Sequence, residues 1–283
     1  VVDDGSTDGT GDVVATYANR GVRGVRQANA GAGAARDAGV RHSRGSLVAF
    51  LDSDDTWLPD KVTRQVAHFR AHPHVALVGG AYLQCDERNE ATAFIPAPRV
   101  AAGHLFERLL VENFIATSTA VVRRTCLEAV GGFGRLPLGQ DWDTWLRIAR
   151  RYAIGFVPDV VALRRAHRDS ISHARADERV AADAAIVAAH LPAVTPAWRR
   201  PIVKARSRST SYYFAAAAAS GHRGDDRSAT RSLIARSLAL DPVTAFDQKA
   251  ALLLKATLPR AAFGPLRGVA RRTQTGVVPR RAR

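Results

Sequence analysis

The sequence of 283 residues contains no methionine and only two cysteines, Cys85 and Cys126. Two cysteines do not build a disulfide framework, and reduced thiols are typical of a cytoplasmic protein. No apolar run approaches the roughly 20 residues that a membrane-spanning helix needs. Because no initiator is present and Val1-Val2 resembles the end of a strand, we expect an N-terminally truncated piece of a longer protein.

Acidic residues are absent after Asp247, whereas Lys and Arg continue to the end of the chain. The whole chain has 41 Lys and Arg against 26 Asp and Glu, a formal charge of +15. A basic tail suits an anionic membrane surface or a nucleic acid. A GC-rich genome that favours Arg and Ala explains it equally well. We expect peripheral contact with the inner face of a membrane, and no nucleic-acid partner.

The composition, 46% hydrophobic and 24% charged, is that of an ordinary globular protein. Two strand–helix units precede residue 46, and this alternation is typical of a doubly wound, mostly parallel α/β sheet. After residue 173 the pattern changes to Ala-rich helical segments. The sequence therefore predicts an α/β domain over residues 1–173 and a helical region with a basic tail over residues 174–283.

An apolar run at residues 47–51 ends in three acids, Asp52, Asp54 and Asp55. Such a run predicts a central strand buried on both faces, and ligands of α/β sheets bind beyond the carboxyl ends of such strands. Three adjacent carboxylates repel one another unless a cation lies among them. The pattern therefore predicts a divalent-metal site. The alternative, capping of the helix expected at residues 59–71, explains one or two of the acids.

Three further places carry polar residues at strand or helix ends. Asp3 and Asp4 follow the first strand, where they could accept hydrogen bonds from a nucleotide base or cap a turn. Arg36 follows a Gly-rich loop at residues 27–33 and could receive a phosphate, although turn chemistry also explains such a loop. Asp141 begins a Trp-rich helix, either as a general base or as a favourable helix-terminal charge.

Together these motifs resemble the family 2 glycosyltransferases over about residues 1–170. The resemblance rests on their order and spacing in this sequence: residues 1–10 (VVDDGSTDGT), 29–39 (NAGAGAARDAG), 50–60 (FLDSDDTWLPD), 131–133 (GGF) and 140–147 (QDWDTWLR). It implies a GT-A fold, which is Rossmann-like, and an inverting transfer from a UDP-, GDP- or dTDP-sugar to a glycan or lipid-linked acceptor. It also implies Mg²⁺ or Mn²⁺, and a role in bacterial cell-surface polysaccharide synthesis.

The resemblance gives each polar residue a role. It implies that Asp4 contacts the nucleotide base with Asp3 beside it, and that Arg36 lies near the diphosphate or ribose. The metal ligands would be Asp55, Asp54 and Asp52, with Asp54 also near the ribose. Asp141 matches the catalytic base.

The chain departs from the family in three places. The family's first strand and its nucleotide-binding turn are absent, Gln140 stands where Glu is common, and Asp37 stands where Asn is common. Two other classes of protein stay open. The run from Asp52 to Thr56 also fits the Asp-x-Asp-x-Thr pattern of haloacid-dehalogenase phosphatases, and a non-catalytic binding module would use only the basic tail.

Overall fold

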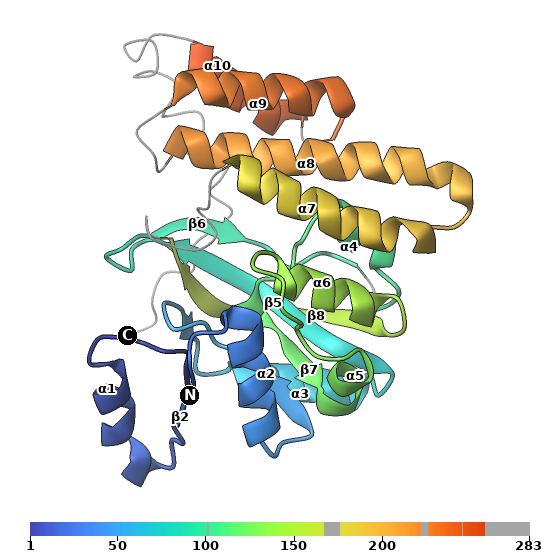
Figure 1. The fold of residues 1–283 in the computed structure, drawn as a ribbon. Coiled ribbons are helices and arrows are strands. Elements are labelled where there is room, and N and C mark those ends of the chain that lie inside the picture. The colour runs from blue at the N-terminus through green and yellow to red at the C-terminus, as the bar shows by residue number, and fades with distance from the viewer. Residues whose placement is uncertain (101, 167–175, 222–225, 245, 258–283) are drawn as a thin grey trace.

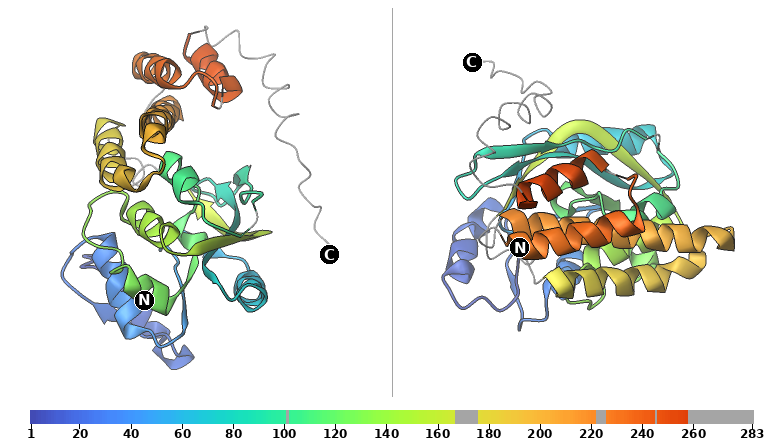
Figure 2. Two further views of the ribbon diagram at one scale, coloured as in Figure 1. Left: turned by 90° about the vertical axis from the view of Figure 1, so that its right-hand side faces the viewer. Right: turned by 90° about the horizontal axis from the view of Figure 1, so that it is seen from above.

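The computed structural model describes residues 1–100, 102–166, 176–221, 226–244 and 246–257 (Figure 1). An α/β part formed by the N-terminal residues lies beneath a stack of long helices from the C-terminal residues (Figures 1 and 2). The predicted α/β fold followed by helices is thus confirmed. The expected boundary at residue 173 and the basic tail lie outside the described residues. None of the described helices is long and apolar enough to cross a membrane.

The main sheet has six strands in the order β3-β7-β5-β8-β4, with β6 also paired to β5. Among the described strands of this sheet, only β5 and β8 pair in parallel, so the sheet is mixed and the expected parallel majority is wrong. One reason is local: β6 returns from β5 through a tight turn, and a hairpin connection forces antiparallel pairing. The bounds are β3 (Leu47–Ala49), β4 (Thr56–Trp57), β5 (Val75–Cys85), β6 (Ala91–Ile95), β7 (Val121–Arg123) and β8 (Ala153–Arg165).

The strand that leads to the acids differs from its prediction. β3 ends at Ala49, lies at one end of the strand order, and alternates between buried and half-buried residues. Leu51 is 48% exposed. A central strand buried on both faces is therefore wrong here, although Phe50 still donates its N–H to the Ala120 carbonyl at 3.3 Å.

The apolar stretches at residues 154–157 and 160–163 belong to one long strand, β8. Its register with β5 jumps where Gly80 pairs with Val157 and Ala81 with Val160. Pro158 lies in this jump. Because proline has no N–H to donate, it is tolerated in a sheet at a bulge.

Two shorter strands, β1 (Val2–Asp3) and β2 (Val25–Arg26), form a separate parallel pair. The helices of the α/β part are α1 (Thr10–Thr16), α2 (Ala32–His42), α3 (Lys61–Ala71), α4 (Phe106–Val111), α5 (Arg124–Ala129) and α6 (Gln140–Ala149). Helix α2 begins very close to the loop at residues 131–134. A Cβ atom at Gly33 would lie only 2.4 Å from the Gly134 carbonyl oxygen.

Aromatic packing fixes helix α6 on the sheet. The Trp145 side chain is fully buried. The centre of the Phe133 ring lies 5.5 Å from that of Trp145 and 4.9 Å from that of Phe50. Trp142 donates its indole N–H to the Leu109 carbonyl at 2.7 Å. Burying one large apolar side chain contributes about 1.5–3 kcal/mol. The predicted apolar stripe of α6 is therefore confirmed, and it fixes the residues at the start of the helix.

The helical region consists of α7 (Ala176–His190), α8 (Arg200–Gly221), α9 (Arg227–Leu240) and α10 (Phe246–Thr257). Helix α8 packs against α4 of the α/β part and against α7 and α9 of its own region (Figure 1). The Asp226 side chain caps α9 by accepting the Ala229 N–H at 2.9 Å. Through α8, the helical region lies directly over the edge of the α/β part that carries the acids.

Candidate active site

A cleft of about 2000 Å³ runs between the α/β part and the helical region. Five of the predicted site residues line it: Arg36, Asp52, Asp54, Asp55 and Asp141. The chain brings them from the start of α2, the segment after β3 and the first turn of α6. The structure thus places the predicted metal ligands and the predicted base around the same cleft.

Asp55 is held by two hydrogen bonds. The Ser118 hydroxyl donates to Oδ2 at 2.6 Å, and the Arg165 backbone N–H donates to Oδ1 at 2.9 Å. Burial raises the pKa of the Asp55 carboxyl in spite of these bonds, and the charges of Asp54 and Asp52 add to the rise. A carboxylate under this repulsion gains from a cation beside it.

The turn Thr117–Thr119, a short 3₁₀ helix, connects the two sides of the site. Thr117 donates its hydroxyl to Asp141 Oδ2 at 3.0 Å, while the next residue, Ser118, binds Asp55. The sequence of residues 116–122 is typical of a strand. The strand begins only at Val121, because the turn comes first and directs both hydroxyls to carboxylates.

Asp141 lies in the first turn of α6, after Gly139 in a left-handed conformation. Its Oδ1 accepts the backbone N–H of Trp142 at 2.8 Å. An acidic side chain is favourable in the first turn of a helix. Each oxygen of a carboxylate has further acceptor capacity, so Asp141 can still take a proton from a group in the cleft.

Asp52 forms an ion pair with Arg36, with Nη2 and Oδ1 2.7 Å apart. The Arg36 guanidinium also lies 5.5 Å from the Phe133 ring centre. Asp52 is therefore neutralised by the protein itself. Within the described residues, no three His, Cys, Asp or Glu side chains are grouped to hold a metal ion, so the expected cluster of three acidic ligands is not formed.

Asp54 and Asp55 fit a metal site in which the protein supplies only some of the ligands. Mg²⁺ and similar ions are commonly bound by one or two carboxylates, with substrate phosphates and water as the other ligands. Asp54 and Asp55 both line the cleft, and the pKa of Asp55 is raised mainly by burial and further by the charges of Asp54 and Asp52. These two residues could hold a metal together with a phosphorylated ligand.

Arg164 is a site residue that the sequence did not reveal. It lines the cleft from the end of β8. Burial alone would lower the pKa of its guanidinium, but Tyr82 and the carboxylates of Asp55 and Asp141 outweigh burial and raise it. Arg164 therefore brings a positive charge close to both carboxylates.

For the neighbouring Arg165 and for His167, the sequence favours solvated loop residues over contact with a diphosphate. In the structure, Arg165 lines the cleft and donates its side chain to Asn89. His167 lies outside the described residues. Both arginines at the end of β8 therefore lie at the cleft.

Asp3 and Asp4 do not line this cleft in the part of the chain described. Asp4 accepts hydrogen bonds from the Gln27 side chain at 2.7 Å and from the backbone N–H groups of Ala30 and Gly31 at 3.0 and 2.8 Å. Asp3 accepts the Ser6 N–H at 2.8 Å, while its Oδ2 is buried with no hydrogen-bond partner among the described residues. Asp4 thus shapes the Gly-rich loop before α2.

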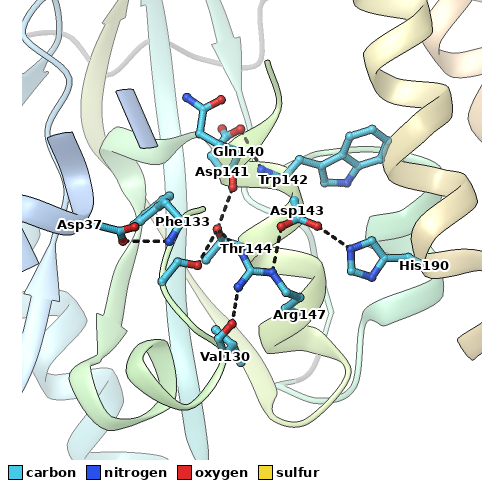
Figure 3. A network of polar contacts seen from close by, with 11 residues as sticks. Asp37, Val130, Phe133, Gln140, Asp141, Trp142, Asp143, Thr144, Arg147 and His190 are labelled. Carbon is cyan, nitrogen blue, oxygen red and sulfur yellow. Dashed lines mark hydrogen bonds and ion pairs between the residues drawn. The ribbon is translucent and has the colours of Figure 1, made fainter. Parts of the chain in front are cut away.

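A network of polar contacts surrounds helix α6 (Figure 3). Asp143 accepts hydrogen bonds from Arg147 at 2.9 Å and from His190 of α7 at 2.8 Å. Arg147 also donates to the Val130 carbonyl. On the other side of the loop at residues 131–134, Asp37 accepts the Phe133 N–H at 2.9 Å. The acid at position 37, a departure from the family pattern, therefore has a structural use.

The helical region supplies one wall of the cleft. Tyr213, Phe214 and Ala217 of α8 line it together with Gln248 of α10. Burial raises the pKa of the Tyr213 hydroxyl, and the nearby charge of Glu112 raises it further. The sequence showed no acid cluster in this region, and its contribution is a surface of aromatic and small side chains.

Comparisons with known proteins find glycosyltransferases among the proteins similar to this chain. Residues 1–131 match the family Glycosyl transferase family 2. The amylovoran biosynthesis glycosyltransferase AmsE of Erwinia amylovora is 29% identical over 149 residues, which cover 52% of this chain and 55% of AmsE. The putative teichuronic acid biosynthesis glycosyltransferase TuaG of Bacillus subtilis is 30% identical over 156 residues, which cover 53% of this chain and 60% of TuaG. The chain thus spans little more than half the length of these relatives.

Solved structures show the same fold. S. aureus TarS (residues 1–349, with UDP-GlcNAc) superposes with a TM-score of 0.61 at 16% identity, covering 98% of this chain and 83% of that one. The mannosyltransferase PcManGT from Pyrobaculum calidifontis, with GDP-Man and Mn²⁺, gives a TM-score of 0.51 at 22% identity, covering 94% and 76%. The chain therefore has the GT-A fold, and its match to glycosyl transferase family 2 covers the first 131 residues.

Proposed function

We propose that this chain transfers a sugar from a nucleotide-sugar donor to an acceptor hydroxyl, with inversion and with Mg²⁺ or Mn²⁺, in the synthesis of a cell-surface polysaccharide. Asp55 and Asp141 carry this proposal, since adjacent hydroxyls hold their carboxylates at the same cleft. The polysaccharide context comes from relatives named for amylovoran and teichuronic acid synthesis.

On the donor side, Asp54 and Asp55 would hold the metal together with the donor's diphosphate. The metal, when bound, supplies Lewis-acid neutralisation of the charge on the departing nucleoside diphosphate. Arg164 adds a fixed positive charge from the protein. Arg36 stays paired with Asp52, so we propose that it orients this carboxylate beside the diphosphate or ribose.

On the acceptor side, Asp141 would remove the proton of the attacking hydroxyl. A general base must be within hydrogen-bond reach of that proton. The Thr117 hydroxyl and the Trp142 N–H fix the direction of the Asp141 carboxylate. A single displacement assisted by one base inverts the anomeric centre, as in inverting glycosidases.

We propose UDP- or GDP-sugars as donors, because the two structural neighbours contain UDP-GlcNAc and GDP-Man. dTDP-sugars are the third candidate. Asp3 and Asp4 remain the proposed residues beside the nucleotide base. Asp3 Oδ2 lies 3.7 Å from Arg26 Nε and accepts no hydrogen bond among the described residues, so it could accept an N–H of a base. The acceptor would be a glycan or a lipid-linked glycan held against α8.

Calorimetric titration of UDP, GDP and dTDP tests the donor site. Each nucleotide is added with Mn²⁺ and then with EDTA. We expect one nucleotide to bind only with the metal. If no nucleotide binds under either condition, the proposed donor site is wrong. Equal binding with Mn²⁺ and with EDTA would overturn the metal's role while leaving the nucleotide site in place.

A further inference from the structure

Lys61 is a buried amine that the proposed chemistry does not use. Its side chain, on the first residue of α3, is only 1% exposed. Placing an ammonium group in the interior of a protein is unfavourable unless hydrogen-bond acceptors surround it. Nζ donates to Gln65 Oε1 at 2.5 Å and to the Thr119 carbonyl at 3.1 Å, and it lies 5.0 Å from the Trp57 ring centre.

The same backbone turn receives two more side-chain donors. Gln65 Nε2 donates to the Thr119 carbonyl at 2.8 Å, and Trp57 Nε1 donates to the Ser118 carbonyl at 2.9 Å. Three side chains from β4 and α3 therefore hold two successive carbonyls of the turn Thr117–Thr119. A 3₁₀ turn of three residues has little internal hydrogen bonding of its own, so its position depends on these anchors.

The opposite side of the turn faces the cleft. The Ser118 oxygen accepts the Asp52 N–H at 3.0 Å, which leaves the hydroxyl proton for Asp55. Thr117 points its hydroxyl to Asp141. Any movement of the turn would move the hydrogen bonds to both carboxylates together.

We propose that Lys61 is a positioning residue, which with Trp57 and Gln65 anchors the turn Thr117–Thr119 and so sets the placement of Asp55 and Asp141. This inference rests on the proposed function. It explains why a buried lysine lies beneath a site that contains no lysine among the residues lining the described cleft.

A double-mutant cycle on metal-dependent nucleotide binding tests the inference, with Lys61→Met and Ser118→Ala as the single changes. Methionine keeps the length of the side chain and removes its donors. Each single change should weaken Mn²⁺-dependent binding about tenfold, the effect of one lost hydrogen bond to a charged group. The double variant should bind no more than about threefold more weakly than either single variant, because both changes break the same connection.

Additive effects, or wild-type affinity in Lys61→Met, would show that Lys61 serves stability alone and would overturn the inference. Trp57→Phe provides a second cycle if Lys61→Met does not fold, because it removes only the donor to the Ser118 carbonyl. Lys249→Met is the matched control: Lys249 is also buried, at 2% exposure, but it binds Ser209 and the Asp241 carbonyl in the helical region. Failure of the wild type to bind any nucleotide would instead overturn the proposed function and this inference with it.

Discussion

His190 of α7 and Asp143 of α6 are joined by a hydrogen bond of 2.8 Å between Nε2 and Oδ1 (Figure 3). The His190 side chain is only 5% exposed. Asp143 lies two residues after the proposed base, Asp141, in the first turn of the same helix. A buried polar pair therefore joins the helical region directly to α6, the helix that carries the proposed base.

Replacing His190 with phenylalanine should slow transfer and leave donor binding unchanged. The aromatic ring keeps its packing against Phe106 but no longer binds Asp143. We expect kcat to fall by about three- to tenfold, as for the loss of one charged hydrogen bond, with unchanged Mn²⁺-dependent nucleotide affinity. The matched control is His104→Phe at an exposed loop position. A loss of nucleotide affinity would contradict the prediction.

Asp141→Asn should remove catalysis while keeping the donor site. The amide has nearly the same shape and one acceptor oxygen, which can serve either Thr117 or the Trp142 N–H, but it cannot take a proton. We expect transfer to fall by about 10²–10⁴-fold, the usual contribution of a general base. Radiolabelled sugar transfer measures the rate, and calorimetry checks nucleotide binding. Normal transfer by this variant would show that another residue is the base.

Asp55→Asn should stabilise the fold while it abolishes metal-dependent binding. Burial raises the pKa of Asp55, so its ionised form is unfavourable in the fold above that pKa. The neutral amide removes this cost and can still pair with Ser118 and the Arg165 N–H. We expect the Tm at pH 7 without metal to rise by about 1–3 °C. A lower Tm would show that the carboxylate itself stabilises the turn.

Asp143 should contribute to stability in the opposite sense. Burial would raise its pKa, but His190 and Arg147 outweigh burial and lower it below the ordinary value of 3.8. A lowered pKa gives stability above pH 4 that is lost as the pH falls through the folded value. Asp143→Asn should lose about 2 kcal/mol at pH 7 and show a weaker fall of stability below pH 4. Urea unfolding at several pH values measures both.

Lys61 should make stability increase with pH above neutrality. Burial lowers the pKa of Lys61 to about 7, whereas an unfolded lysine titrates near 10.4. Between these values the unfolded chain binds more protons, so unfolding becomes less favourable as the pH rises. The free energy of unfolding should increase from pH 7 to pH 9 in the wild type and much less in Lys61→Met. A parallel pH dependence in both would place the pKa of Lys61 outside this range.

Patterns along the sequence predicted the long, amphipathic elements and the gathering of the acids. Helix α6 could be predicted because its tryptophans recur at helical spacing, and Asp141 follows from its place at the start. The direction of the strands could not be predicted, because apolar runs carry no information on whether a neighbour runs parallel or antiparallel.

The partners of the site residues could not be predicted either. Nothing in the run at residues 52–55 shows that Arg36 neutralises Asp52, or that a 3₁₀ turn places Ser118 on Asp55. Arg164 lies at the end of β8, and no motif in the sequence marks it as a site residue. These contacts join residues far apart in the chain, so they depend on the assembled tertiary structure.

The cleft has one wall from each part of the chain, with the carboxylates on one side and Tyr213 and Phe214 of α8 on the other. A molecule held there touches both parts at once, so its binding free energy opposes their separation. Substrate would then act as a reversible cross-link between the two halves. A chimaera that exchanges α7 to α10 between relatives would change which acceptors fit while keeping the same carboxylates.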